Sequence, residues 1–98
     1  MAITLNKQAI KCEQIALASG SITPNSSPNA HLYDISRQWR RLCHATKHLS
    51  TEIVGYTEKE EKAAEVILAT LTYLQRIGCA NIERLLLDTI EHHARQIE

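Results

Sequence analysis

The sequence predicts an all-α protein built as a four-helix bundle, and three observations support this fold class. Apolar residues recur at spacings of three and four along four stretches of the chain, which is the pattern of one face of an α-helix. A residue type that caps helices precedes each stretch. No stretch alternates polar and apolar residues in the way that a half-buried strand does. The chain has 98 residues, which is the size of one domain.

The predicted helices have recognisable starts and stops. They span residues 5–19, 28–48, 58–77 and 82–95. The side chains expected to cap their N-termini, by accepting hydrogen bonds from the free N–H groups of the first turn, are Thr4, Ser27, Thr57 and Asn81. Pro28 suits the first position of the second helix, and Glu60 completes a capping box at the start of the third. Gly20 and Gly78 supply the stops after the first and third helices.

The third predicted helix is apolar around most of its circumference from Val66 to Ile77. A helix of this kind has to be enclosed on several sides. A lone chain of this length buries only about two-thirds of the surface that it exposes when unfolded. We therefore expect the bundle to complete its core by dimerisation, with this apolar segment at the centre of a homodimer. The residues of the last helix expected to face the core are Ile82, Leu85, Leu86 and Ile90.

Composition argues against several classes of partner and location. Eleven basic and eleven acidic side chains cancel, so no overall field favours nucleic acid or an anionic membrane. The longest uncharged apolar stretch, residues 66–75, is too short to span a bilayer. The first residues lack a basic segment leading into an apolar run, so no signal peptide is expected. We expect a protein of the cytoplasm, without membrane or nucleic-acid partners.

The thiols and imidazoles do not form a clear metal motif. Cys12, Cys43 and Cys79 lack the paired spacing of a zinc site or a disulfide framework, so we interpret them as buried structural thiols. His44 and His48 are four residues apart, a spacing that can bind Zn²⁺, but no third ligand accompanies them. Surface histidines are the ordinary interpretation of such a pair.

An acidic cluster opens the third predicted helix. Glu58, Glu61 and Glu65 are three and four residues apart, so their carboxylates would project from one face. Such a group could hold Mg²⁺, which prefers oxygen ligands. The alternative is a solvated cluster that complements the positive end of the helix dipole. The sequence leaves both interpretations open.

A basic cluster and the only Trp lie on the second predicted helix. The guanidinium groups of Arg37, Arg40 and Arg41 could grip a phosphate, stay solvated, or pair with the acids of the third helix. We expect at least one of them to form such a pair. Trp39 is expected either to anchor the core or to lie at a dimer interface or the mouth of a pocket.

With these residues in place, the chain resembles the MazG-like all-α nucleotide pyrophosphohydrolases. The similarity covers residues 5–95 and is carried by the helix layout and by the third helix, which runs through Ala-Glu-Val-Ile-Leu (64–68) and Tyr-Leu to Gly78. In that family, two Glu three residues apart on the second helix and a Glu followed by an Asp on the third hold Mg²⁺. The metal organises the triphosphate and the attacking water. The resemblance also implies a homo-oligomer, because the family's chains associate through their buried helices.

This chain departs from the family's metal motif. Gln38 and Arg41 occupy the positions of the two Glu on the second helix. Glu65 falls where the Asp of the third helix would lie, and its partner falls at Lys62 or Glu61. An Arg in a metal position repels Mg²⁺ and prefers a carboxylate. We therefore expect Arg41 to form a salt bridge to Glu61 or Glu65 in place of the metal.

The altered motif predicts a non-catalytic relative: a small helical homodimer that binds a small molecule or a protein partner, with no catalytic residue and no cofactor. The binding site would lie in the cleft that holds the substrate in the family. The residues expected to border it are Arg37, Gln38, Trp39, Arg41, Glu61 and Glu65. The alternative is a divergent nucleoside triphosphate pyrophosphohydrolase, whose Mg²⁺ would be held by Glu58, Glu61, Glu65 and Asp34.

Overall fold

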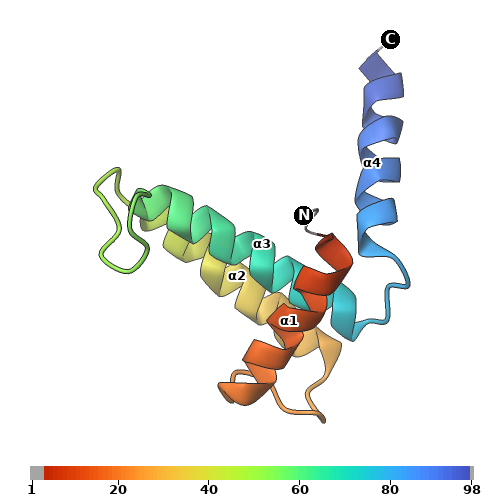
Figure 1. The fold of residues 1–98 in the computed structure, drawn as a ribbon, viewed down its shortest axis with the longest axis horizontal. Helices are drawn as coiled ribbons and strands as arrows, with labels where there is room; N and C mark the ends of the chain where they lie inside the picture. The colour runs from red at the N-terminus through yellow and green to blue at the C-terminus, as the bar shows by residue number, and fades with distance from the viewer. Residues whose placement is uncertain (1–3, 98) are drawn as a thin grey trace.

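The structure is a computed structural model that describes residues 4–97. Its helices are α1 (Leu5–Ala18), α2 (Pro28–His44), α3 (Glu58–Arg76) and α4 (Ile82–Ile97). Within this range there are four helices and no strand, so the all-α fold class is confirmed. Figure 1 shows α2 and α3 side by side, α1 lying across α3, and α4 projecting away from the other three. None of the four helices is both long and apolar enough to cross a membrane.

Each helix begins at the cap that the sequence indicates. The caps accept hydrogen bonds from N–H groups two or three residues further on: Thr4 from Lys7, Ser27 from Asn29, Thr57 from Glu60 and Asn81 from Arg84. The capping box at α3 is complete, because the Glu60 carboxylate accepts from the backbone N–H of Thr57 at 3.0 Å. This backbone bond and a second bond, donated by the Thr57 hydroxyl to the same carboxylate at 3.0 Å, lower the pKa of the Glu60 carboxyl.

α2 ends at His44, four residues before the end expected from the sequence. Ala45 adopts an extended conformation with ψ 151°, and the chain continues as a loop to Thr57. Backbone bonds hold this loop together, including Ser50 N to Tyr56 O at 2.8 Å and Glu58 N to His48 O at 2.8 Å. His44 and His48 therefore do not share a helical face, because only His44 lies in the helix.

α3 ends in a Schellman motif centred on Gly78, which has φ +81°. The N–H of Cys79 donates to the carbonyl of Leu74 at 3.1 Å, and the N–H of Gly78 donates to that of Gln75 at 3.2 Å. Leu74 and Cys79 also pack against the buried core cluster. The stop predicted at Gly78 is confirmed, and it turns the chain sharply before α4.

The buried core is small and lies where α1, α3 and the start of α4 meet. Its fully covered cluster consists of Ala9, Leu71 and Ile82. Ile82 is 1% exposed, but it is the only buried residue of α4. The expectation that Leu85, Leu86 and Ile90 face the core is therefore wrong for the single chain, because α4 leaves the bundle after its first turn and all three are exposed.

Candidate functional site

Two adjacent cavities lie along α3, and they share Glu65 and Leu68. The first has a volume of about 570 Å³ and is lined mainly by α3 and the loop before it. Its lining includes Ile53, Tyr56, Glu61 and Ala64. The second, of about 240 Å³, is an open hollow lined by residues of α1, α2 and α3. Its lining includes Ile15, Ala16, Arg37, Gln38 and Ala69. We call the two cavities together the α3 groove.

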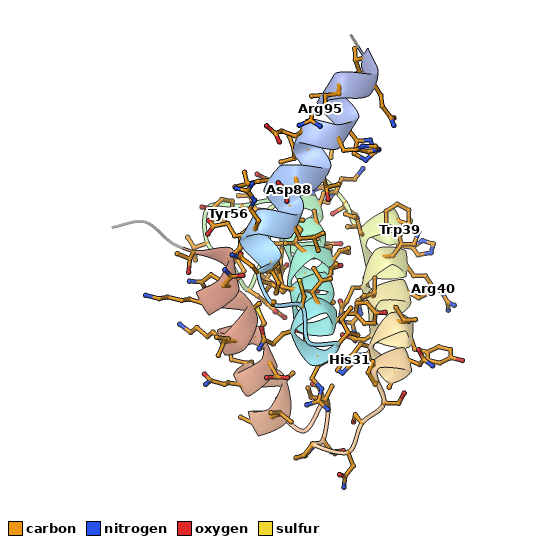
Figure 2. The ribbon with its side chains drawn as sticks, turned by 90° about the vertical axis from the view of Figure 1, so that its right-hand side faces the viewer. His31, Trp39, Arg40, Tyr56, Asp88 and Arg95 are labelled. Carbon is orange, nitrogen blue, oxygen red and sulfur yellow. The ribbon has the colours of Figure 1, made fainter. Side chains whose placement is uncertain are left out.

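The structure brings four of the six predicted site residues to this groove. Arg37 and Gln38 line the second cavity, Glu61 lines the first, and Glu65 lines both. Trp39 and Arg41 line neither cavity and are exposed on α2. Figure 2 shows Trp39 and Arg40 on the outer side of α2, away from α3. With its side chain 56% exposed, Trp39 is not a core anchor.

The expected salt bridge from Arg41 is not formed. Instead, the Lys62 ammonium lies 3.6 Å from Glu65 Oε1 and 4.0 Å from Glu61 Oε1. Lys62 lies on α3 together with both acids, so these pairs do not require a side chain of another helix to be held in place against α3. The side chain of Arg37 pairs within α2 to Asp34. The prediction that an arginine of this cluster pairs with the acids of α3 is therefore wrong.

The three acids of the cluster predicted on α3, Glu58, Glu61 and Glu65, have different closest partners. Glu58 accepts from the backbone N–H of Thr46 at 3.2 Å, and Glu61 accepts from the Ser50 hydroxyl at 2.9 Å. The Glu61 side chain is 9% exposed, so its bond to Ser50 satisfies a largely buried carboxylate. Glu65 is the member paired most closely with Lys62. The cluster therefore tethers the loop before α3 to the helix.

These residues do not fit a Mg²⁺ site in one chain. Among residues 4–97, no three His, Cys, Asp or Glu side chains are close enough together to hold a metal ion. The Lys62 ammonium lies against Glu61 and Glu65 and would repel a divalent cation there. Asp34, the fourth ligand of the enzymatic alternative, is engaged with Arg37.

Two acceptor oxygens of the groove lack a donor. Gln38 Oε1 and Glu65 Oε2 are both buried, and neither receives a hydrogen bond within the described residues. Both residues line the second cavity. A buried acceptor without a donor costs free energy, about 1–3 kcal/mol for a neutral group and more for a charged one. A ligand that offers N–H or O–H groups to this cavity would recover that cost.

A second cluster, beside the N-terminal end of α2, was not predicted. The guanidinium of Arg76 donates to the carbonyls of Thr23, Pro24 and Ser26 at 3.2–3.4 Å, and it also pairs with Glu13 at 3.5 Å. It therefore fixes the α1–α2 loop, in which Ile22 is buried. An isolated arginine near a helix end carries no sequence signal for this role.

His31 lies beside this loop, on the side of α2 that faces α3 (Figure 2), and is 2% exposed. Burial lowers the pKa of His31, and the charge of Arg76 lowers it further, whereas Asp34 and Glu13 act in the opposite direction. Its Nε2 has no hydrogen-bond partner among the described residues. The surroundings therefore favour the neutral imidazole.

The cysteines differ in exposure. Cys12 and Cys79 are partly buried, and burial raises the pKa of the Cys12 thiol. Cys43 is exposed, so the interpretation of all three as buried structural thiols is wrong for Cys43.

Comparison of the chain with protein-family models, with curated proteins and with solved structures finds no match.

Proposed function

We propose that this chain is a non-catalytic helical interaction module that works as a homodimer, and that it is a divergent relative of the MazG-like proteins. The observation that carries the proposal is the size of the surface. The chain exposes 7523 Å². A compact folded protein of 11.1 kDa exposes about 5,700 Å² by the usual scaling of surface with mass.

The excess is of the size that a stable dimer removes. It amounts to about 1,900 Å² per chain, or about 3,700 Å² for two chains, which falls within the range of obligate homodimer interfaces. The radius of gyration agrees, because it is 15.0 Å where a compact chain of this length has about 13 Å. Large apolar side chains contribute to this surface, and on α3 and α4 they include Ile67, Leu68, Leu86 and Ile90, which are all exposed. Apolar surface of this kind favours association.

Binding of a small molecule is a second candidate function, supported by the two acceptor oxygens without donors. Gln38 Oε1 and Glu65 Oε2 favour a ligand that donates hydrogen bonds, such as an amine or a polyol. Turnover of nucleotides is the alternative. It would require acids from a second chain, because the acids among residues 4–97 of one chain do not form a metal site. Residence in the cytoplasm stays a prediction.

Light scattering on the purified protein at several concentrations tests the proposal. We expect twice the mass of one chain at micromolar concentration, whereas a strict monomer would refute the homodimer. Incubation with nucleoside triphosphates and Mg²⁺ tests the enzymatic alternative in the same preparation. We expect no pyrophosphate, and turnover that Glu65→Ala abolishes would overturn the non-catalytic assignment.

A further inference from the structure

We propose that the two copies bind through α4, with the apolar face of α4 from each chain lying in the α3 groove of the other. This inference depends on the homodimer proposed above and specifies its interface. It differs from the expectation drawn from the sequence, which put the apolar segment of α3 at the centre of the homodimer. Four features of the chain support it.

The first feature is the two-faced character of α4. Ile82, Leu86, Ile90 and Ile97 follow one another at spacings of four and seven, so they share one face of the helix. Beyond Ile82 this face is open: Ile90 is 64% exposed and Ile97 is 87% exposed. Four charged residues pair with each other on the other side of the helix, Arg84 with Asp88 at 3.2 Å and Glu91 with Arg95 at 3.4 Å. These four side chains on the polar side of α4 therefore have partners within the helix. The apolar face beyond Ile82 has no such partner among the described residues of the single chain.

The second feature is a clamp that holds α4 away from its own bundle. The side chain of Asn6, on α1, accepts hydrogen bonds from the N–H groups of Ile82 at 2.7 Å and Glu83 at 3.2 Å. It also donates to Asn81 at 3.0 Å. With Ile82 buried against the core, these bonds fix the direction in which α4 leaves. To fold back over its own groove, α4 would have to break this clamp, so the groove stays open to another molecule.

The third feature is the shape of the α3 groove. Its α3 lining extends from Glu60 to Thr72, which is about 18 Å of helix. The exposed stripe of α4 from Leu86 to Ile97 is about 17 Å long, so the lengths match. Small side chains in the lining, at Ala16 and Ala64, leave room for a helix to approach closely. Binding of an amphipathic helix in a groove is a common mode of recognition, and Ile53, Ala64 and Leu68 give the α3 groove apolar lining for it.

The fourth feature is the amount of surface, which favours a second copy as the occupant. In a two-fold dimer each chain both gives an α4 and receives one, so both open surfaces of the chain are covered at once. The excess of about 1,900 Å² per chain then has a single explanation. A different partner protein would cover the groove or α4, but it would need two separate binding faces to cover both.

The experiment compares three full-length variants by sedimentation equilibrium. Ile90→Glu puts a carboxylate into the proposed interface from α4, and Leu68→Glu does so from the groove. His92→Glu is the matched control, since it puts the same carboxylate on α4 two residues away and therefore on a different side of the helix. Ile90 and Leu68 are both exposed in the single chain, so we expect the variants to keep their helical circular dichroism.

We expect the wild type and His92→Glu to be equally dimeric. Ile90→Glu and Leu68→Glu should each weaken the dimer by about a hundredfold or more, because each dimer would bury two unpaired carboxylates. Dissociation by Ile90→Glu without an effect of Leu68→Glu would indicate that two α4 helices pair with each other, which overturns the assignment to the groove.

A further variant separates failure of the interface from failure of the dimer. Ile67 is exposed on α3 but lies outside the groove lining. If the wild type is dimeric and Ile67→Glu dissociates it while Ile90→Glu does not, the homodimer stands and the exchange of α4 is refuted. A monomeric wild type refutes both.

Discussion

Replacement of Ile82 by alanine tests whether the start of α4 belongs to the core. Ile82 is 1% exposed and packs with Ala9 and Leu71. Truncation of a buried isoleucine to alanine costs about 2–5 kcal/mol, through lost burial and the cavity left behind. We expect a loss of about 3 kcal/mol, near the lower end, because Ala9 and Cys79 are small and the cluster can partly collapse.

Urea denaturation followed by far-UV circular dichroism measures this loss. In a domain of this size, about 3 kcal/mol corresponds to a fall in Tm of about 12–24 °C. The matched control is Val54→Ala, in the loop before α3, where the side chain is 92% exposed and the expected change stays within about 0.5 kcal/mol. All samples need the same protein concentration, because dimerisation contributes to apparent stability. A loss below about 1 kcal/mol for Ile82→Ala would refute the packing of α4 against α1 and α3.

Three further predictions concern the pKa of His31, the thiols and the cap of α3. Because the folded pKa of His31 is lowered, its contribution to stability should be complete above its unfolded pKa near 6.5 and should be lost as the pH falls through the folded value. Thermal melts should therefore show a Tm that falls on acidification, with a smaller fall in His31→Gln; equal falls would contradict the buried neutral imidazole. Alkylation followed by mass spectrometry should label exposed Cys43 before Cys12, whose thiol pKa is raised by burial, and the reverse order would contradict the positions of these residues. Thr57→Ala should cost about 1 kcal/mol in urea denaturation, and an unchanged midpoint would mean that the capping box adds nothing.

Local features of this fold could be predicted from the sequence. The four caps and the glycine stop at Gly78 depend on residues within a few positions of each other, and all lie where the sequence indicated. The start of a helix can be predicted from neighbouring residues, because a cap requires only one side chain and the N–H groups of the first turn that follows it. The end of α2 was less predictable, because it depends on the backbone hydrogen bonds of the loop that follows.

The direction of α4 could not be predicted from local pattern. The apolar stripe of α4 correctly indicates a helix, but it does not say whether the apolar face is covered by its own chain, which leaves Leu86 and Ile90 exposed, or by another. Asn6, which sets the direction of α4, is 76 residues away from Ile82 in the sequence. No local signal marks such a distant cap.

The candidate site was predicted in part. Arg37, Gln38, Glu61 and Glu65 do line the α3 groove. The predicted ion pairs join α2 to α3, whereas the pairs that form lie within a single helix, Arg37 with Asp34 on α2 and Lys62 with Glu65 on α3. Lys62, beside Glu61 and three residues from Glu65, competes for the same acids at a lower cost in side-chain ordering.

The most direct test of the exchange of α4 is an isotope-filtered NMR measurement on a dimer that mixes labelled and unlabelled copies. Only contacts between different copies give signals in such a spectrum. We predict nuclear Overhauser effects from the methyl groups of Leu86 and Ile90 in one copy to Leu68 and Tyr56 in the other. Signals only between the α4 helices, or only between the α3 helices through Ile67, would contradict this arrangement.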